Sequence, residues 1–207
     1  MKYNPKIHNR RSIRLKGYDY SQEGLYFITI CCQNREHFFG KITNNEMILN
    51  DAGKMIKQEW LAISQRFKNI ELEEYIIMPN HFHAILNIVG ATLVVDPIKE
   101  KVVNPIKEKV VDPIKEKGQP QGIAPTDFPT GSPTNKTVGD IIGAFKSITT
   151  NEYIKNVKSN NWKRFEGKLW QRNYWEHIIR NKKAYINISE YIVNNPKKWK
   201  NDTLHTK

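Results

Sequence analysis

Apolar residues in the first 90 positions of the chain form the short runs and two-residue alternation that are typical of β-strands. Residues 25–32 (LYFITICC) are β-branched and aromatic, which predicts a buried strand. Residues 38–49 predict a hairpin that turns at a Thr-Asn-Asn sequence. Residues 71–78 and 82–89 predict two further strands, joined by the short turn Met-Pro-Asn.

Helical spacing of apolar residues predicts three helices. The first covers 51–67, and the second covers 137–153 and begins with a capping box in which Asp replaces the usual Glu or Gln. Residues 169–179 are expected to be extended. The last helix covers 181–195, and we expect Pro196 to end it, because a proline disfavours helical geometry at the residue before it.

The order of these elements predicts an α+β domain, in which helices pack on one face of an antiparallel sheet. One segment stands apart, because residues 94–117 contain three copies of the octapeptide VVDPIKEK, with Asn104 as the single difference. A proline in every copy breaks both helices and strands. With the Pro-, Gly- and Thr-rich stretch that follows, this predicts a flexible insertion at 91–135. We therefore expect one domain across 1–207, interrupted by this insertion.

The net charge of +12 is concentrated in the last third of the chain. Residues 136–207 hold 15 Lys and Arg against 6 Asp and Glu, whereas residues 1–90 hold 12 against 9. Aromatic residues are interleaved with this charge, as in the sequences WKRF and KKWK. Cations bind phosphates and aromatic faces stack on unpaired bases, so the mixture favours a nucleic-acid partner, single strands above all. A generic basic surface is the alternative that charge alone leaves open.

Several classes of protein are disfavoured by the composition. No apolar run approaches the roughly 20 residues of a membrane helix, and the basic start lacks the apolar segment of a signal peptide. We expect a soluble, cytoplasmic protein that does not bind membranes. The two cysteines, Cys31 and Cys32, are neighbours on opposite faces of a strand, so a disulfide between them is not expected. No C-x-x-C sequence is present, which argues against a zinc ribbon.

His81 and His83 are the first candidate metal ligands. Residues two apart in a strand project to the same face, so both imidazoles can reach one ion. The alternate positions, from Phe82 onward, are wholly apolar, and Ile85 and Val89 on the histidine face are also apolar, which predicts a central strand covered on both sides. Imidazoles at the end of a buried strand need partners for their nitrogens, and a metal would supply one. The alternative is that they are ordinary polar residues at the mouth of a strand.

Tyr191 and Asn195 form the second candidate group. They are four residues apart in the last predicted helix and therefore share a face. A carboxamide oxygen is a hard neutral ligand suited to Mg²⁺ or Mn²⁺, and the negative end of the helix dipole favours a nearby cation. A buried core aromatic is the alternative reading of Tyr191. For His177, in a basic aromatic stretch, packing or a phosphate contact is the expected role.

Five stretches of the chain resemble, in the same order, the REP-associated tyrosine transposases of bacteria, which are single-tyrosine HUH transposases: RRSIRLKGYDYSQEGLYFITICCQ, YIIMPNHFHAILNIV, VGDIIGAFKS, LWQRNYWEHIIRN and YIVNNP. They cover nearly all of the chain outside 91–135, where the octapeptides depart from the family pattern. The resemblance implies a ferredoxin-like or RRM-like sheet with the H-x-H sequence on a central strand and the tyrosine on a helix above it. It further implies that His81, His83 and Asn195 bind Mg²⁺ or Mn²⁺ and that Tyr191 is the nucleophile.

The activity implied by this resemblance is cleavage of single-stranded or hairpin DNA and strand transfer through a 5′-phosphotyrosine. The implied location is the bacterial cytoplasm, with association with the nucleoid when the protein is bound to DNA. By charge and location, six residues are candidate phosphate contacts: Arg10, Arg11, Arg14, Lys146, Arg172 and Arg180. A non-catalytic or domesticated binder of single strands is the alternative, and a structural metal protein is disfavoured because a closed zinc site would need a fourth Cys or His. The DNA target, the choice between monomer and homodimer, and whether the tyrosine acts within its own subunit stay open.

Overall fold

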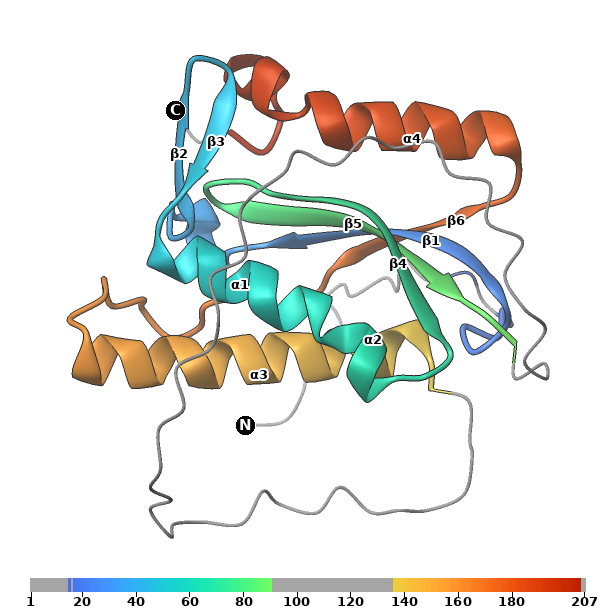
Figure 1. Cartoon of the computed structure of the whole chain (residues 1–207), viewed down its shortest axis with the longest axis horizontal. Helices are drawn as coiled ribbons and strands as arrows, with labels where there is room; N and C mark the ends of the chain where they lie inside the picture. The colour runs from blue at the N-terminus through green and yellow to red at the C-terminus, as the bar shows by residue number, and fades with distance from the viewer. Residues whose placement is uncertain (1–14, 16, 91–135, 206–207) are drawn as a thin grey trace, which may run out of the picture. The chain divides into compact units, whose positions relative to one another are not determined.

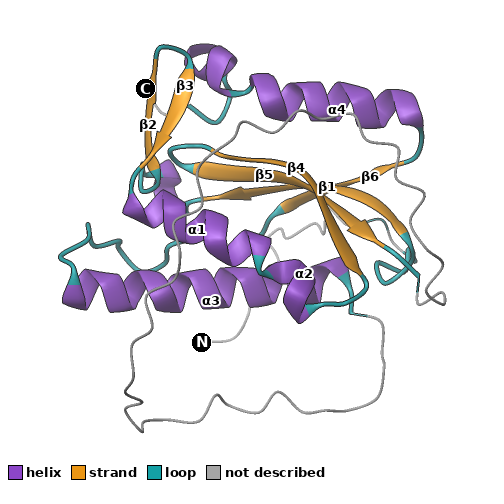
Figure 2. Ribbon diagram, viewed as in Figure 1, coloured by secondary structure: helices purple, strands orange, loops and turns teal. Residues whose placement is uncertain are grey.

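A four-stranded antiparallel sheet is the centre of the computed structural model, which describes residues 15, 17–90 and 136–205 (Figures 1 and 2). The insertion expected at 91–135 lies outside the described residues, as do Arg10, Arg11 and Arg14. The strands are ordered β4-β5-β1-β6, with a separate hairpin of β2 and β3. Their bounds are β1 Gly24–Cys31, β2 Gly40–Thr43, β3 Glu46–Leu49, β4 Ile70–Ile77, β5 His81–Ile88 and β6 Trp175–Ile179.

Helices cover both faces of this sheet (Figure 1). The chain crosses from β1 to β4 through α1 and α2, and from β5 to β6 through α3. Connections between parallel strands of a sheet are right-handed, so both crossovers place their helices on the same face. The last helix, α4, lies on the opposite face. The helix bounds are α1 Asp51–Leu61, α2 Ile63–Arg66, α3 Val138–Ser159 and α4 Lys182–Asn194, with short 3-10 helices η1 Gln33–Arg35 and η2 Pro196–Asn201.

The predicted α+β class and ferredoxin-like strand order are confirmed, and α4 adds a layer on the second face. The helix predicted over 51–67 is divided at Ala62, whose ψ of −8° departs from helical geometry, and Ile63 in the following turn is buried. The helix predicted over 137–153 extends to Ser159, because Tyr153 and Val157 continue its core-facing stripe. Of the extended segment predicted over 169–179, the last five residues form β6.

Helix α4 ends at Asn194, next to Asn195 and Pro196, as expected from the sequence, but the expected loss of helical geometry at Asn195 is wrong. Asn195 has helical backbone angles, φ −56° and ψ −43°, and the chain continues directly into η2. Proline is tolerated in the first turn of a helix, where its missing N–H has no partner to lose. Pro196 occupies that position in η2. The chain therefore continues into η2, which contacts β3.

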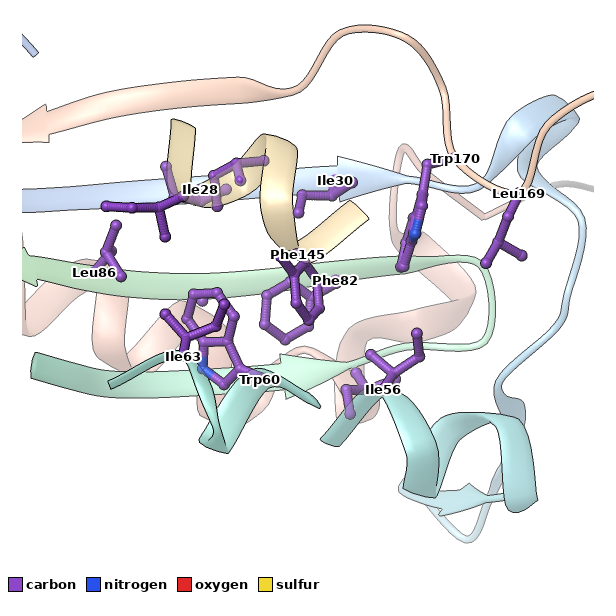
Figure 3. Close-up of a cluster of buried hydrophobic side chains, with 14 of the residues drawn as sticks. Ile28, Ile30, Ile56, Trp60, Ile63, Phe82, Leu86, Phe145, Leu169 and Trp170 are labelled. Atoms are coloured by element: carbon purple, nitrogen blue, oxygen red, sulfur yellow. The ribbon is translucent and has the colours of Figure 1, made fainter. Parts of the chain in front are cut away.

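The main core lies between the sheet and helices α1–α3 (Figure 3). Trp60 from α1 meets Phe82 from β5 and Phe145 from α3, with ring centroids 4.8 and 5.3 Å apart. All three side chains are completely buried. Close packing of three aromatic rings from three elements fixes β5 against the helical layer.

Replacing Trp60 tests this packing. We expect Trp60→Ala to lower the free energy of unfolding by about 3–5 kcal/mol, because it removes a buried ring and leaves a cavity. Equilibrium urea denaturation measures the change. The control is Leu61→Ala at the neighbouring residue, which is 45% exposed and should change stability by less than about 0.5 kcal/mol. Equal losses in the two variants would contradict the assigned core.

Candidate metal and tyrosine site

Strand β5 places His81 and His83 on the face of the sheet that α4 covers. Residues directly opposite in paired strands project to the same side, and β1 pairs Cys31 with His81 and Thr29 with His83. The two imidazoles are buried, with 0% and 2% of their surface exposed, and their ring centroids lie 4.6 Å apart. Intervening Phe82 points into the opposite core. The predicted central strand with two histidines on one face is confirmed.

Hydrogen bonds to the Nδ1 atoms orient both imidazoles. His83 Nδ1 lies 2.8 Å from Thr29 Oγ1, and His81 Nδ1 lies 2.8 Å from the side-chain oxygen of Asn80. The orientation of the Asn80 amide is fixed, because its nitrogen donates to the carbonyls of Arg35 and Leu204 at 3.1 and 2.9 Å. His81 Nδ1 therefore carries the ring proton and donates a hydrogen bond to the Asn80 side-chain oxygen. The lone pair of His81 is left on Nε2, the atom that lies 3.8 Å from the Asp202 carboxylate.

Helix α4 brings Tyr191 against these imidazoles. The Tyr191 hydroxyl lies 3.3 Å from His83 Nε2, and the two ring centroids are 5.2 Å apart. Phe27 stacks on His83 and makes an edge-to-face contact with the Tyr191 ring. These two contacts hold His83 and Tyr191 in position relative to each other. Tyr191 is 38% exposed, so part of its side chain is in contact with solvent. The predicted proximity of the tyrosine to the histidines is present within one subunit.

A β-bulge in β4 anchors α4 above the histidines. The register between β4 and β5 shifts between Leu72 and Tyr75, and the bulge turns both intervening glutamates toward α4. The Tyr185 hydroxyl lies 3.0 Å from a carboxylate oxygen of Glu73 and 3.0 Å from one of Glu74. Ser189 adds a hydrogen bond to Glu74 at 3.2 Å. Bulges re-aim side chains in this way, and this one sets the position of the helix that carries Tyr191.

Two further side chains with oxygen atoms, those of Asn195 and Asp202, reach the site from the last part of the described chain. Asn195 is 1% exposed, and its carboxamide lies beside His81 and Tyr191. The carboxylate of Asp202 follows η2 and lies 3.8 Å from His81 Nε2. Among the described residues, His81, His83 and Asp202 form a group whose ligand atoms all lie within 4.8 Å of one another. Sequence analysis did not identify Asp202, which follows the run KKWKN as a lone acidic residue.

Three of these polar atoms have no hydrogen-bond partner among the described residues: His81 Nε2, the side-chain oxygen of Asn195 and Asp202 Oδ2. All three are buried. A nitrogen lone pair, a neutral oxygen and a carboxylate oxygen are acceptors, so a cation satisfies them together, whereas none can satisfy another by donating. The residues therefore fit a divalent metal, and His81, His83 and Asp202 could hold one.

Burial keeps both imidazoles in the neutral form that binds metals. It lowers the pKa of His81 to about 3, an effect that the Asn195 carboxamide opposes and that the charges of Arg35 and His37 reinforce. Burial also lowers the pKa of His83 well below its usual range, with His81 as a further cause. The pKa of Tyr191 is raised, first by burial and then by the charge of Asp202. The phenol is therefore protonated in this arrangement.

The candidate phosphate contacts within the described residues lie apart from this cluster. Arg172 and Arg180 are exposed and flank β6 on either side. Lys146 donates to the carbonyls of Gln171 and Arg172 at 2.6 and 3.0 Å, and burial, with Lys168 as a further cause, lowers its pKa to about 8. Its ammonium thus ties the segment before β6 to α3. None of the helices in the described ranges has the length and apolar character of a transmembrane segment.

The chain is 42% identical over 204 residues to an uncharacterized protein of Haemophilus influenzae, a match that covers 99% of this chain and 97% of that protein. The chain belongs to the family of that protein. No family model matches the chain.

Two solved structures have loosely similar backbones. A REP-associated tyrosine transposase bound to a REP hairpin has a TM-score of 0.47 and 15% identity, over 90% of this chain and 74% of that chain. A candidate transposase from Deinococcus radiodurans has a TM-score of 0.41 and 14% identity, over 88% of this chain and 97% of that chain.

Metal binding can be measured directly with Mn²⁺ or Mg²⁺. A saturating concentration near 100 times the dissociation constant should stabilise the protein by about 2.7 kcal/mol, through preferential binding to the folded chain. We expect Asp202→Asn to weaken binding by about tenfold or more, because it removes the anionic ligand. Calorimetric titration and thermal unfolding report both effects. The control is Glu190→Gln, an exposed carboxylate on α4, and equal affinity in the two variants would exclude Asp202 as a ligand.

The depressed pKa of His81 predicts a pH dependence of the metal-free protein. Below the unfolded pKa near 6.5, the unfolded chain takes up a proton that the folded chain, with a pKa of about 3 at His81, does not. Stability should therefore fall as pH drops from 6.5 towards 5, by about 1–2 kcal/mol for this histidine. Urea denaturation in a chelating buffer should show a shallower pH slope for His81→Gln than for the parent. The exposed His177→Gln is the control, and parallel slopes for His81→Gln and the parent would contradict the prediction.

Proposed function

We propose that this chain is a metal-dependent nuclease and strand transferase that cuts single-stranded DNA with Tyr191. One observation carries the proposal: a half-exposed phenol from α4 lies 3.3 Å from a buried, neutral imidazole, beside three buried acceptor atoms that lack partners among the described residues. Such a cluster combines a nucleophile with a place for a cation. The motif resemblance in the sequence and the basic second half of the chain support the same activity.

The residues divide into ligands and nucleophile. His81, His83 and Asp202 would hold the ion, with the oxygen of Asn195 as a further ligand from the same side. A divalent ion there would polarise the scissile phosphate and offset its developing charge. Oxygen-rich donor sets with imidazole suit Mn²⁺ or Mg²⁺. The hydrogen bonds of Thr29 and Asn80 with the two Nδ1 atoms orient the rings, so that both Nε2 atoms would be directed at the ion.

The chemistry at Tyr191 is a transesterification. Its hydroxyl oxygen forms a bond to phosphorus, the bond from phosphorus to the 3′ oxygen breaks, and the DNA on the 3′ side of the cut becomes linked to the protein through a 5′-phosphotyrosine. The phenolic proton passes to solvent, to which the side chain is open, and the leaving 3′ oxygen takes up a proton. One ester replaces another, so the reverse step rejoins strands without a nucleotide cofactor.

The proposal predicts a covalent adduct that Tyr191→Phe abolishes. Purified protein is incubated with labelled single-stranded hairpin DNA and Mn²⁺ or Mg²⁺, and the products are separated on a denaturing gel. A label at the 3′ end should migrate with the protein, whereas a label at the 5′ end should appear on a free fragment. Tyr191→Phe should lose the adduct and keep its affinity for DNA within about twofold, because only the nucleophilic oxygen is removed.

The matched control is Tyr75→Phe, which removes a hydroxyl from the opposite face of the sheet, where Tyr75 packs near Phe82, and should still form the adduct. Adduct formation by Tyr191→Phe would refute the assigned nucleophile. DNA binding without any adduct in the parent protein would instead assign the chain as a non-catalytic binder of single strands.

A further inference from the structure

Strand β6 carries two aromatic side chains, Trp175 and His177, at positions that pair with Thr29 and Phe27 of β1. Thr29 on β1 pairs with His83 on one side and with Trp175 on the other, and Phe27 pairs with His177. Directly paired residues share a face, so Trp175 and His177 lie on the face that carries His83 and Tyr191. Adjacent strands are about 4.8 Å apart, which puts the backbone at Trp175 about 10 Å from that at His83.

Trp175 and His177 are both exposed, whereas His81 and His83 on the same face are buried. Trp175 is 62% exposed, whereas the other four tryptophans of the chain are buried or half-buried. Helix α4 packs against β4 and β5, on the far side of the sheet from the β6 edge. An exposed tryptophan carries a large apolar surface that water solvates poorly, so its position beside a candidate active site points to a ligand that stacks on it.

Spacing and charge indicate the kind of ligand. Side chains two residues apart on a strand lie about 7 Å from each other, twice the roughly 3.4 Å separation of stacked bases. One flat nucleobase therefore fits between the indole of Trp175 and the imidazole of His177. Exposed Arg172 and Arg180 flank the strand, where their charges suit the phosphates on either side of that base.

We infer that Trp175 and His177 form a stacking platform for one unpaired base of the DNA strand that Tyr191 cleaves. This rests on the proposed function for the identity of the substrate. The platform holds a base close to the scissile phosphodiester, and it selects single strands because a paired base cannot enter between the two rings. Stacking on aromatic side chains tolerates every base, so the platform contributes affinity and position more than sequence preference.

Binding to a single-stranded oligonucleotide tests the platform without any chemistry. Fluorescence anisotropy of a labelled 20-nucleotide strand is measured in a chelating buffer in the Tyr191→Phe background. Trp175→Ala should raise the dissociation constant by about tenfold or more, and Trp175→Phe should restore most of the affinity, because a phenyl ring still stacks. Tryptophan emission of the parent should also be quenched by the strand, and Trp175→Phe should lose most of that quenching, since Trp175 is the exposed tryptophan.

Matched controls separate stacking from other effects. Leu61→Ala removes an exposed apolar side chain from α1, on the helical layer of the other face, and should bind the strand as the parent does. The duplex of the same sequence should bind Trp175→Ala and parent equally, since stacking needs an unpaired base. Equal single-strand affinity in Trp175→Ala and parent overturns the platform, as does an equal loss on single strand and duplex, or stronger binding of RNA or a protein at this surface than of single-stranded DNA.

The two proposals fail in different ways. Adduct formation by the parent, together with unchanged binding in Trp175→Ala, would remove the platform and leave the nuclease. Tenfold weaker binding in Trp175→Ala, together with no adduct in the parent, would leave a single-strand binding surface and remove the catalytic assignment.

Discussion

The register between β1 and β5 is the constraint on which the rest of the site depends. Side chains alternate between the two faces of a strand, so the pairing of Thr29 with His83 and of Cys31 with His81 commits both imidazoles to one face. A slip of one residue would turn them into the core and expose Phe82 instead. The aromatic cluster of Trp60, Phe82 and Phe145 prevents that slip, because it is buried only in this register. The core thereby fixes the chemistry on the opposite face.

Two departures from regular structure then complete the site. The bulge in β4 directs two glutamates at Tyr185, which sets the height and rotation of α4 and with them the position of Tyr191. The continuation of the chain through Pro196 into η2 returns Asp202 to the histidines. Arg35 donates a hydrogen bond to the carbonyl of Thr203, and Asn80 donates one to the carbonyl of Leu204. These two hydrogen bonds hold this last segment in place. Asn80 therefore links the orientation of His81 to the segment that delivers the carboxylate.

Sequence patterns identified the parts of the site that depend on local periodicity. His81 and His83 follow from the two-residue period of a strand, and Tyr191 with Asn195 from the period of a helix. Asp202 could not be found in this way, because its position depends on helical geometry at Asn195 and on contacts with residues more than 120 positions earlier. The exposure of Trp175 could not be predicted from the sequence either, since it depends on where α4 crosses the sheet. Long-range packing, which no local period records, decides both.

The three buried acceptor atoms without hydrogen-bond partners lower the stability of the folded chain when no ligand is bound. A buried polar group without a partner costs about 1–3 kcal/mol, and more when it is charged. Three such atoms meet here, from His81, Asn195 and Asp202. A closed structural metal site would surround its ion with protein ligands, whereas this cluster borders Tyr191, whose side chain is 38% exposed. His83, which Tyr191 contacts, lies on the face of the sheet that also carries the exposed aromatic residues of β6. The stability given up at the buried acceptors is therefore consistent with a cation that shares its remaining coordination with a phosphate.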